Sequence, residues 1–333
     1  MKNILEKFTI RNSKGFSAIV SPFGAKLISL IVPDKNGFFR DVVIGFDQDE
    51  DYFLHDPYLN SVCGRFAGRI GKAKFNLNGQ EYRLTQNAGE HQLHGGFQGF
   101  HNRFWKVESH PESSITLSYF SEDGEEGFPG NLKVWVTYEM DEQNQIITRF
   151  QAQTDQTTVV NLCQHPYFNL NGSGTIFDHQ LQIDSDQYLL CDDQMIPTGV
   201  IKSVDQTILD FRNSKRVKEV IEDPILAVTQ GLDHCFIIKN KGISCIERAS
   251  VLYAPESGIR LEVFSNQKAL VVYSGNFIED HPGKNGTMNG KHTAICLESQ
   301  GFPDSPNHKH FPSSVLEPGE EFESIICWRF SAE

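Results

Sequence analysis

The chain is organised around the stretch Asn161-Leu162-Cys163-Gln164-His165-Pro166-Tyr167-Phe168-Asn169-Leu170. The apolar residues of Val159–Leu162 predict a strand. Proline has no N–H to donate to a sheet, so we expect the strand to end, or to become an edge, at Pro166. His165 would then lie at a strand end, where side chains can enter a cleft. A packed histidine with satisfied ring nitrogens is an equally good interpretation of this stretch alone.

Outward from this stretch, short runs that alternate apolar and polar residues dominate the chain. They are Lys26–Val32, Ser114–Phe120, Leu132–Met140, Arg260–Ser265 and Phe322–Phe330. Turn dipeptides such as Asn171-Gly172 separate them, and Phe75–Tyr82 is typical of a tight hairpin. A short helix is expected only over residues 213–221. We therefore predict an all-β fold, a large antiparallel β-sandwich with few short helices, as a single domain over residues 1–333.

Composition narrows the possible partners. The 333 residues carry 30 basic and 43 acidic side chains, a formal charge of −13. Nucleic acids and anionic membranes require clustered Lys and Arg, so neither is an expected partner. No apolar run approaches the length of a membrane span, and Met1–Lys7 lacks the features of a signal peptide.

The seven cysteines indicate a reducing compartment. They are scattered at positions 63, 163, 191, 235, 245, 296 and 327. Several lie in apolar runs, so we expect small buried hydrophobic side chains and no disulfide framework. No Cys-x-x-Cys spacing indicates zinc. We expect a cytoplasmic protein.

Two arginines lie in a glycine-rich segment, Cys63–Gly71, whose three glycines permit a tightly shaped loop. Arg65 and Arg69 each offer several fixed hydrogen-bond donors, which suits a site that binds neutral hydroxyl groups. A surface ion pair is the more common role of an arginine. The spacing does not match a phosphate-binding loop.

Four further histidines, besides His165 and His234, could take part in chemistry. His91 and His94 have the i, i+3 spacing of a helical metal pair, but the following Gly95-Gly96 favours a loop, with a histidine hydrogen-bonding on a cleft wall. His308 and His310 alternate in a proline-rich loop. We expect these two to be solvated loop residues without an acidic partner.

Two carboxylates lie at the ends of apolar runs. Asp233 precedes a strand-like run together with His234, and either a backbone-capping turn or a site at a sheet rim would explain the pair. Glu298 ends the apolar run Thr293–Leu297. A glutamate placed there is half-exposed or desolvated, and desolvation raises its pKa toward that of a general base.

Six motifs in order give the chain a family resemblance. They are Gly64–Ile70, Asn87 with Leu93–Gly96, Asn161–Leu170, Gly231–His234, Tyr273–Phe277 and Leu297–Gln300 with Pro303–His308. Each motif alone is weak, but together they resemble the aldose 1-epimerase, or galactose mutarotase, family over nearly the whole chain.

The resemblance implies a large β-sandwich that interconverts the α and β anomers of free aldohexoses such as galactose and glucose. It implies Glu298 as the general base and His165 as the general acid. Arg69, His94 and Asp233 match the residues that hold sugar hydroxyls, and Tyr167 lies in the same pocket. No metal or organic cofactor is expected, the partner is a small monosaccharide, and the protein is expected to be a monomer or a homodimer.

Some features leave alternatives open. Many family members have Asn where this chain has Gly68, and Gln where it has Val271, so either change could remove a sugar contact. Besides Tyr167, the aromatic residues Phe97 and Phe302 could pack against a sugar face, although ordinary packing would explain each of them.

Three other functions compete with anomer exchange. A glycoside hydrolase would use two carboxylates, here Asp233 and Glu298. A non-catalytic sugar-binding module would keep the pocket without the chemistry. An enzyme acting on sugar phosphates would need more cationic groups than Arg65 and Arg69 supply.

Overall fold

The computed structural model describes residues 4–55, 58–239 and 246–333. Over these residues the regular structure is almost entirely β, and the two α-helices are short: α1 (Asp51–Leu54) and α2 (Val217–Ile221). The strand pairs that build the large sheets are antiparallel. The predicted all-β antiparallel sandwich with few short helices is confirmed. None of the described helices has the length and apolar character needed to cross a bilayer.

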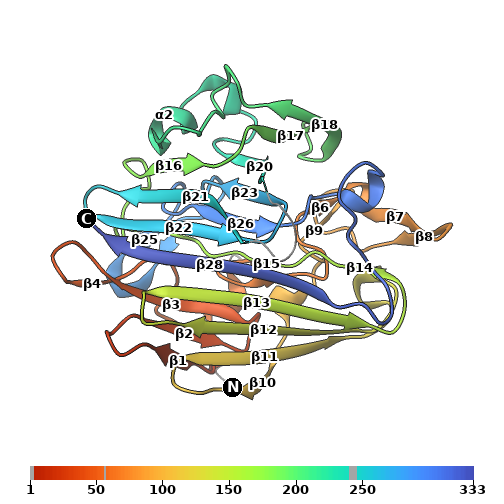
Figure 1. Cartoon of the computed structure of the whole chain (residues 1–333), viewed down its shortest axis with the longest axis horizontal. Coiled ribbons are helices and arrows are strands. Elements are labelled where there is room, and N and C mark those ends of the chain that lie inside the picture. The colour runs from red at the N-terminus through yellow and green to blue at the C-terminus, as the bar shows by residue number, and fades with distance from the viewer. Residues whose placement is uncertain (1–3, 56–57, 240–245) are drawn as a thin grey trace.

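A nine-stranded sheet forms the largest layer, and most of its strands run side by side across the molecule (Figure 1). In spatial order its strands are β10 (Lys106–Ser109), β11 (Ser114–Ser121), β12 (Leu132–Met140), β13 (Gln145–Thr154), β28 (Phe322–Ala332), β22 (Ile259–Ser265), β21 (Glu247–Ala254), β16 (Gln180–Ile183) and β19 (Lys215–Arg216).

Two smaller sheets accompany it. The five-stranded sheet contains, in order, β18 (Pro197–Ser203), β17 (Gln187–Cys191), β20 (Asp233–Ile237), β23 (Ala269–Tyr273) and β26 (Cys296–Gln300). The four-stranded sheet contains β1 (Phe8–Arg11), β2 (Ser17–Ser21), β3 (Lys26–Pro33) and β4 (Phe39–Asp41). One cluster of buried side chains includes Leu30 of β3, Val136 of β12 and Leu297 of β26, so all three sheets share a hydrophobic core.

Short two-stranded pairs and single helical turns complete the described chain. The pairs are β5 (Val62–Cys63) with β15 (Cys163–Gln164), β6 (Arg69–Ile70) with β9 (Gln92–Leu93), β7 (Lys74–Leu77) with β8 (Gln80–Arg83), β14 (Thr158–Val159) with β27 (Val315–Leu316), and β24 (His281–Pro282) with β25 (Met288–Asn289). The 3₁₀ turns are Gly71–Ala73, Phe100–Asn102, Glu125–Gly127, Pro224–Leu226, Lys284–Gly286 and Ser305–Asn307.

Alternation in the sequence predicted several strands well. Every second residue of β12 is buried, beginning at Leu132 and ending at Met140, and β22 follows the same pattern. The predicted hairpin is β7–β8, and its turn residues Asn78 and Gly79 have φ angles of 51° and 83°. Such positive φ values are those a two-residue type I′ turn requires.

Two expectations were wrong in part. The first half of β3 is buried on both faces, including Lys26, whose ammonium group donates to the Leu59 carbonyl at 3.3 Å and to the Ser61 hydroxyl. Hydrogen bonds to oxygen allow this charged side chain to be buried.

Residues 213–221 were expected to form a helix. Instead, Lys215–Arg216 pair with β16 as strand β19, and only Val217–Ile221 is helical.

No disulfide joins the described cysteines, and of these only Cys191 is partly exposed. Cys245 lies outside the described residues. Burial of the other five agrees with their predicted role as small apolar side chains.

Candidate active site

One face of the five-stranded sheet forms the wall of a cavity of about 510 Å³. Alternate residues of three neighbouring strands line it: Asp233 and Cys235 of β20, Val271 and Tyr273 of β23, and Glu298 and Gln300 of β26. Successive side chains of a strand point to opposite faces. The opposite face of the same strands, which carries Phe236, Leu270 and Leu297, therefore packs into the core.

His165 enters this cavity from the stretch that opened the sequence analysis. The strand expected over Val159–Leu162 is broken, because β14 ends at Val159 and β15 begins at Cys163. The expected end is confirmed, since β15 stops at Gln164, directly before His165 and Pro166. The buried side chain of Asn60 fixes the following segment, because its Oδ1 accepts a hydrogen bond of 2.8 Å from the N–H of Tyr167. The histidine is thus held at a strand end by backbone contacts on both sides.

His165 and Glu298 meet inside the cavity although their positions in the sequence differ by 133. The His165 Nε2 lies 3.1 Å from Oε1 of Glu298, and their side chains are only 5% and 2% exposed. Burial, together with the charge of Asp233, raises the pKa of Glu298 well above its ordinary value. Burial lowers the pKa of His165 to about 3. The protein environment therefore favours uncharged forms of both groups, with a proton held on the carboxyl group.

Arg69 and Asp233 form a second polar part of the cavity wall. Burial raises the pKa of Asp233 to about 6, and the Arg69 charge opposes that rise. The backbone of Arg69 is fixed from the loop after β26, since its carbonyl accepts a 2.8 Å hydrogen bond from Asp304. The Asp304 carboxylate also accepts from the N–H of Gly71 at 2.9 Å. The loop that follows β26 thus holds the backbone of the arginine in place.

His94 and Tyr167 both pack against the His165 ring. The ring centroids of His94 and His165 are 5.2 Å apart at a steep angle, whereas Tyr167 stacks on His165 at 5.0 Å. His94 Nδ1 accepts a 3.3 Å hydrogen bond from the N–H of Gly68. Its Nε2 must therefore carry the proton while the ring is neutral, and burial lowers the pKa of His94 well below its usual range. His94 is then a hydrogen-bond donor.

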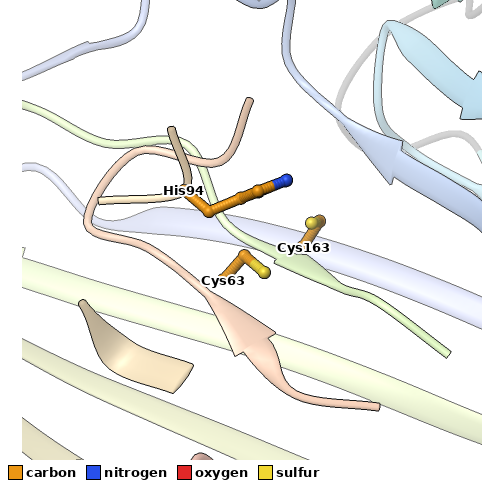
Figure 2. A group of neighbouring side chains, drawn as sticks. All are labelled: Cys63, His94 and Cys163. Carbon is orange, nitrogen blue, oxygen red and sulfur yellow. The ribbon is translucent and has the colours of Figure 1, made fainter. Parts of the chain in front are cut away.

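Two thiols lie beneath these groups. Figure 2 shows the His94 side chain gathered with the sulfur atoms of Cys63 and Cys163. Cys63 and Cys163 face each other across β5 and β15, and the Cys163 thiol donates to Oε2 of Glu298 at 3.6 Å. The two thiols and the His94 imidazole could hold a soft metal ion. His94, His165 and Glu298 form a second possible ligand group, with nitrogen and oxygen atoms. Burial raises the pKa of the Cys163 thiol well above its usual range, which disfavours the thiolate that a metal needs.

Several sequence candidates lie elsewhere. Arg65 was a candidate cation for the pocket, but it is buried and donates from Nη1 to the carbonyls of Pro129 and Gly130, both at 2.8 Å. Its role is structural, because it satisfies the backbone of a loop. His91 contacts Gln194 at 2.7 Å and does not join His94.

Three further expectations need correction or are only partly met. His308 was expected to lack an acidic partner, yet its Nε2 lies 3.2 Å from Asp304. Phe97 is exposed and Phe302 packs against Phe311, and neither contributes to the described cavity lining. His234 lies on the face of β20 opposite to Asp233.

The sequence analysis missed several lining residues. The Gln300 amide is buried, lines the cavity and has no hydrogen-bond partner among the described residues, which marks it as a group that a ligand can satisfy. Tyr273 shares its strand face with Val271, so period-2 alternation could have identified it. Tyr58, His55 and His281 come from short segments that carry no such signal.

The two departures from the family pattern have visible consequences. Val271 pairs directly with Glu298 in the β23–β26 register and lines the cavity, so an apolar side chain stands beside the carboxylate. Gly68 has a φ of +79°, and an added Cβ would lie 3.0 Å from the Cβ of Pro303. A side chain at position 68 would therefore press on Pro303 in the loop that follows β26.

Comparisons with known proteins match this chain over nearly its whole length. The family model described as aldose 1-epimerase matches residues 6–327. Galactose mutarotase of Mus musculus is 40% identical over 332 residues, which cover 98% of this chain and 94% of that protein. Aldose 1-epimerase of Escherichia coli K12 is 35% identical over 329 residues, with 98% and 95% covered. The crystal structure of an aldose epimerase homologue from C. elegans superposes with a TM-score of 0.93 at 33% identity, covering 99% of each chain.

Proposed function

The chain belongs to the aldose 1-epimerase family, and we propose that it interconverts the α and β anomers of free aldohexoses such as galactose and glucose. The observation that carries this proposal is the 3.1 Å contact between the His165 imidazole and the Glu298 carboxyl group inside the cavity. Two proton-exchanging groups on one wall are what ring opening and closing of a sugar require.

Anomer exchange moves two protons. One leaves the hydroxyl on C1 and one reaches the ring oxygen, so the ring opens to an aldehyde. Rotation about C1–C2 then presents the other face, and closure reverses both transfers. We assign removal of the C1 proton to Glu298 and delivery to the ring oxygen to His165. Each positioned group typically contributes about 10²–10⁴-fold, which suffices for a reaction that also proceeds in water, so neither metal nor organic cofactor is needed.

The proton content of the pair fits this cycle. Burial favours a carboxylic acid beside a neutral imidazole, so the resting pair holds one exchangeable proton, on Glu298. The contact between Nε2 and Oε1 allows that proton to cross to His165, leaving Glu298 as the base. When Glu298 has taken the sugar proton and His165 has given its own, the pair is again in the form that burial favours. That form then coexists with the open-chain aldehyde.

The remaining wall groups would hold the sugar. Arg69 and His94 offer N–H donors and Asp233 offers acceptors, which together match several neutral hydroxyls. Tyr167 would bound the pocket beside His165. The amide of Gln300, which lacks a partner among the described residues, would add one further contact.

Polarimetry of freshly dissolved pure α-galactose tests the activity. We expect the protein to accelerate the approach to equilibrium rotation with α-galactose and with α-glucose. Tight binding of galactose without acceleration would contradict anomer exchange and would favour a sugar-binding module. Release of monosaccharide from a disaccharide would favour a glycoside hydrolase that uses Asp233 and Glu298.

An enzyme for sugar phosphates fits the cavity less well. Among the described lining residues Arg69 is the one Lys or Arg side chain, while Asp233, Glu279 and Glu298 are all acidic. A phosphate group would meet more negative than positive charge there. Rates on galactose 6-phosphate below those on galactose are therefore expected.

A reducing, cytoplasmic location is also part of the proposal. Cys63 and Cys163 face each other in an antiparallel pair and do not form a disulfide, which supports a reducing compartment. The protein is expected to act as a monomer or a homodimer, which its sedimentation behaviour would decide.

A further inference from the structure

A second cluster of ligand-type side chains lies at the edge of the cavity, apart from the His165–Glu298 pair. Asp51 begins α1 and His55 follows four residues later, so the two side chains share one face of a helical turn. His281 of β24 approaches from the other end of the chain. One nitrogen or oxygen atom of each residue lies within 4.8 Å of the others.

These three groups point at one another without forming hydrogen bonds. The Nε2 atoms of His55 and His281 each lie 3.9 Å from Oδ1 of Asp51, and the two imidazole centroids are 4.1 Å apart. Hydrogen bonds between such atoms have lengths of about 2.7–3.2 Å. The atoms therefore surround a small common space instead of satisfying each other.

The tautomer of His281 suits a metal ligand. Its Nδ1 lies 2.9 Å from the carbonyl oxygen of Pro282, and a carbonyl oxygen can only accept. Nδ1 must therefore carry a hydrogen, which leaves the Nε2 lone pair of the neutral ring directed toward Asp51. Metal-bound histidines usually donate their other ring N–H to a carbonyl or a carboxylate in this way.

The spacing fits a tetrahedral ion after a small contraction. With metal–ligand bonds of about 2.0–2.1 Å, ligand atoms of a tetrahedral Zn²⁺ site are roughly 3.4 Å apart. The side chains of His55, His281 and Asp51 are 35%, 23% and 20% exposed, which leaves them room to rotate and shorten the two 3.9 Å separations. Charge favours a cation too, because Glu279 also lines the cavity and the chain carries a net charge of −13.

We propose that Asp51, His55 and His281 bind one divalent transition-metal ion of the Zn²⁺ class at the mouth of the sugar pocket. Two imidazoles and a carboxylate leave at least one coordination position for water or another ligand. His55 and His281 line the cavity and Phe46 contacts both rings, so a bound ion would lie at the edge that a sugar passes. This site is independent of the proton exchange assigned to His165 and Glu298.

Titration of the tag-free full chain with Co²⁺, used as a spectroscopic probe for Zn²⁺, tests the site. Saturating galactose is present so that the inner residues of the pocket are occupied. We expect one equivalent to bind, with visible absorption typical of nitrogen and oxygen ligands and no thiolate charge-transfer band. Calorimetric titration should likewise show one equivalent of Zn²⁺ bound, and this Zn²⁺ should raise the melting temperature of the protein.

Two variants and a matched control decide the assignment. His281→Ala and His55→Ala should each weaken Co²⁺ binding by at least tenfold. His308→Ala is the control and should leave Co²⁺ binding unchanged. Asp304 and His308 are also four residues apart, like Asp51 and His55, but the His308 imidazole already contacts the Asp304 carboxylate at 3.2 Å. Unchanged binding in both His55→Ala and His281→Ala, or a thiolate band in the wild-type spectrum, would overturn the proposal. Neither readout depends on whether the protein exchanges anomers.

Discussion

Strand β12 of the nine-stranded sheet and strand β26 of the five-stranded sheet differ in which side chains they bury. In β12 every second residue is buried, and these residues are apolar apart from the Tyr138 hydroxyl, which bonds to Ala25 and Gln164. In β26 all five residues of Cys296–Gln300 are buried, and three of them are polar. The first strand lowers the free energy of the fold, whereas the second holds polar groups away from water for a sugar to meet. Substitutions should therefore affect stability in one sheet and activity in the other.

The largest expected effect is at the proton-exchanging pair. Glu298→Gln and His165→Asn should each lower the mutarotation rate by about 10²–10⁴-fold, because each removes a positioned acid or base. The fold should remain intact, since Glu298→Gln keeps the side-chain shape, His165→Asn keeps a smaller polar side chain, and each removes a buried ionisable group. Polarimetry and thermal melting measure the two properties separately. Near wild-type rates in either variant would contradict the assigned roles.

The nine-stranded sheet should respond in the reverse manner. Phe150 of β13 is fully buried in the shared core, and Phe150→Ala should lower the free energy of unfolding by about 3–5 kcal/mol. The turnover number of the protein that stays folded should be unchanged, because the side chain lies outside the cavity lining. Denaturant unfolding with rates per folded molecule provides the measurement. A loss of turnover at unchanged stability would remove the contrast between the two sheets.

Two arginines four residues apart sharpen the same contrast. Arg69→Ala should raise KM for galactose by roughly 10–100-fold with little change in melting temperature, because hydrogen bonds to a charged group contribute about 1.5–3 kcal/mol. Arg65→Ala is the matched control and should mainly destabilise the fold, since it leaves buried carbonyls without their donor. If Arg65→Ala raised KM and Arg69→Ala unfolded the protein, the two roles would be reversed.

These arginines also show what the sequence could and could not predict. Alternation predicted β12, β22 and the hairpin, because one buried face imposes a period of two. Six motifs in order identified the family and, by matching, the residues that the structure brings together: His165, Glu298, Arg69, His94 and Asp233. Taken without the family match, the glycine-rich segment did not distinguish Arg65 from Arg69. The difference arises from a distant loop, because the carbonyl groups of Pro129 and Gly130 bind the Arg65 guanidinium and keep it out of the cavity. Gln300 was missed because an unsatisfied amide is visible only once its surroundings are known.

The smallest expected effect concerns the stability contribution of Asp233. Its folded-state pKa is raised from 3.8 to about 6 by burial, so the folded state binds this proton more tightly than the unfolded state. Stability from this group is present below pH 3.8 and is lost as pH rises through about 6. Because the residue is only half-buried, Asp233→Asn should stabilise the protein by about 1–2 kcal/mol at pH 8 and by nothing at pH 3.5. Melting curves at the two pH values give the comparison, and a stabilisation confined to acid pH would contradict the sign.

The most direct test of the central claim is the mutarotation rate of the double variant Glu298→Gln/His165→Asn beside the two single variants. Groups that exchange protons with the same sugar act as one unit, and losing either removes most of what both supply. We predict that the double variant is no more than a few-fold slower than the slower single variant. Losses that multiply across the two sites would show that the imidazole and the carboxyl group act independently, and would contradict the account.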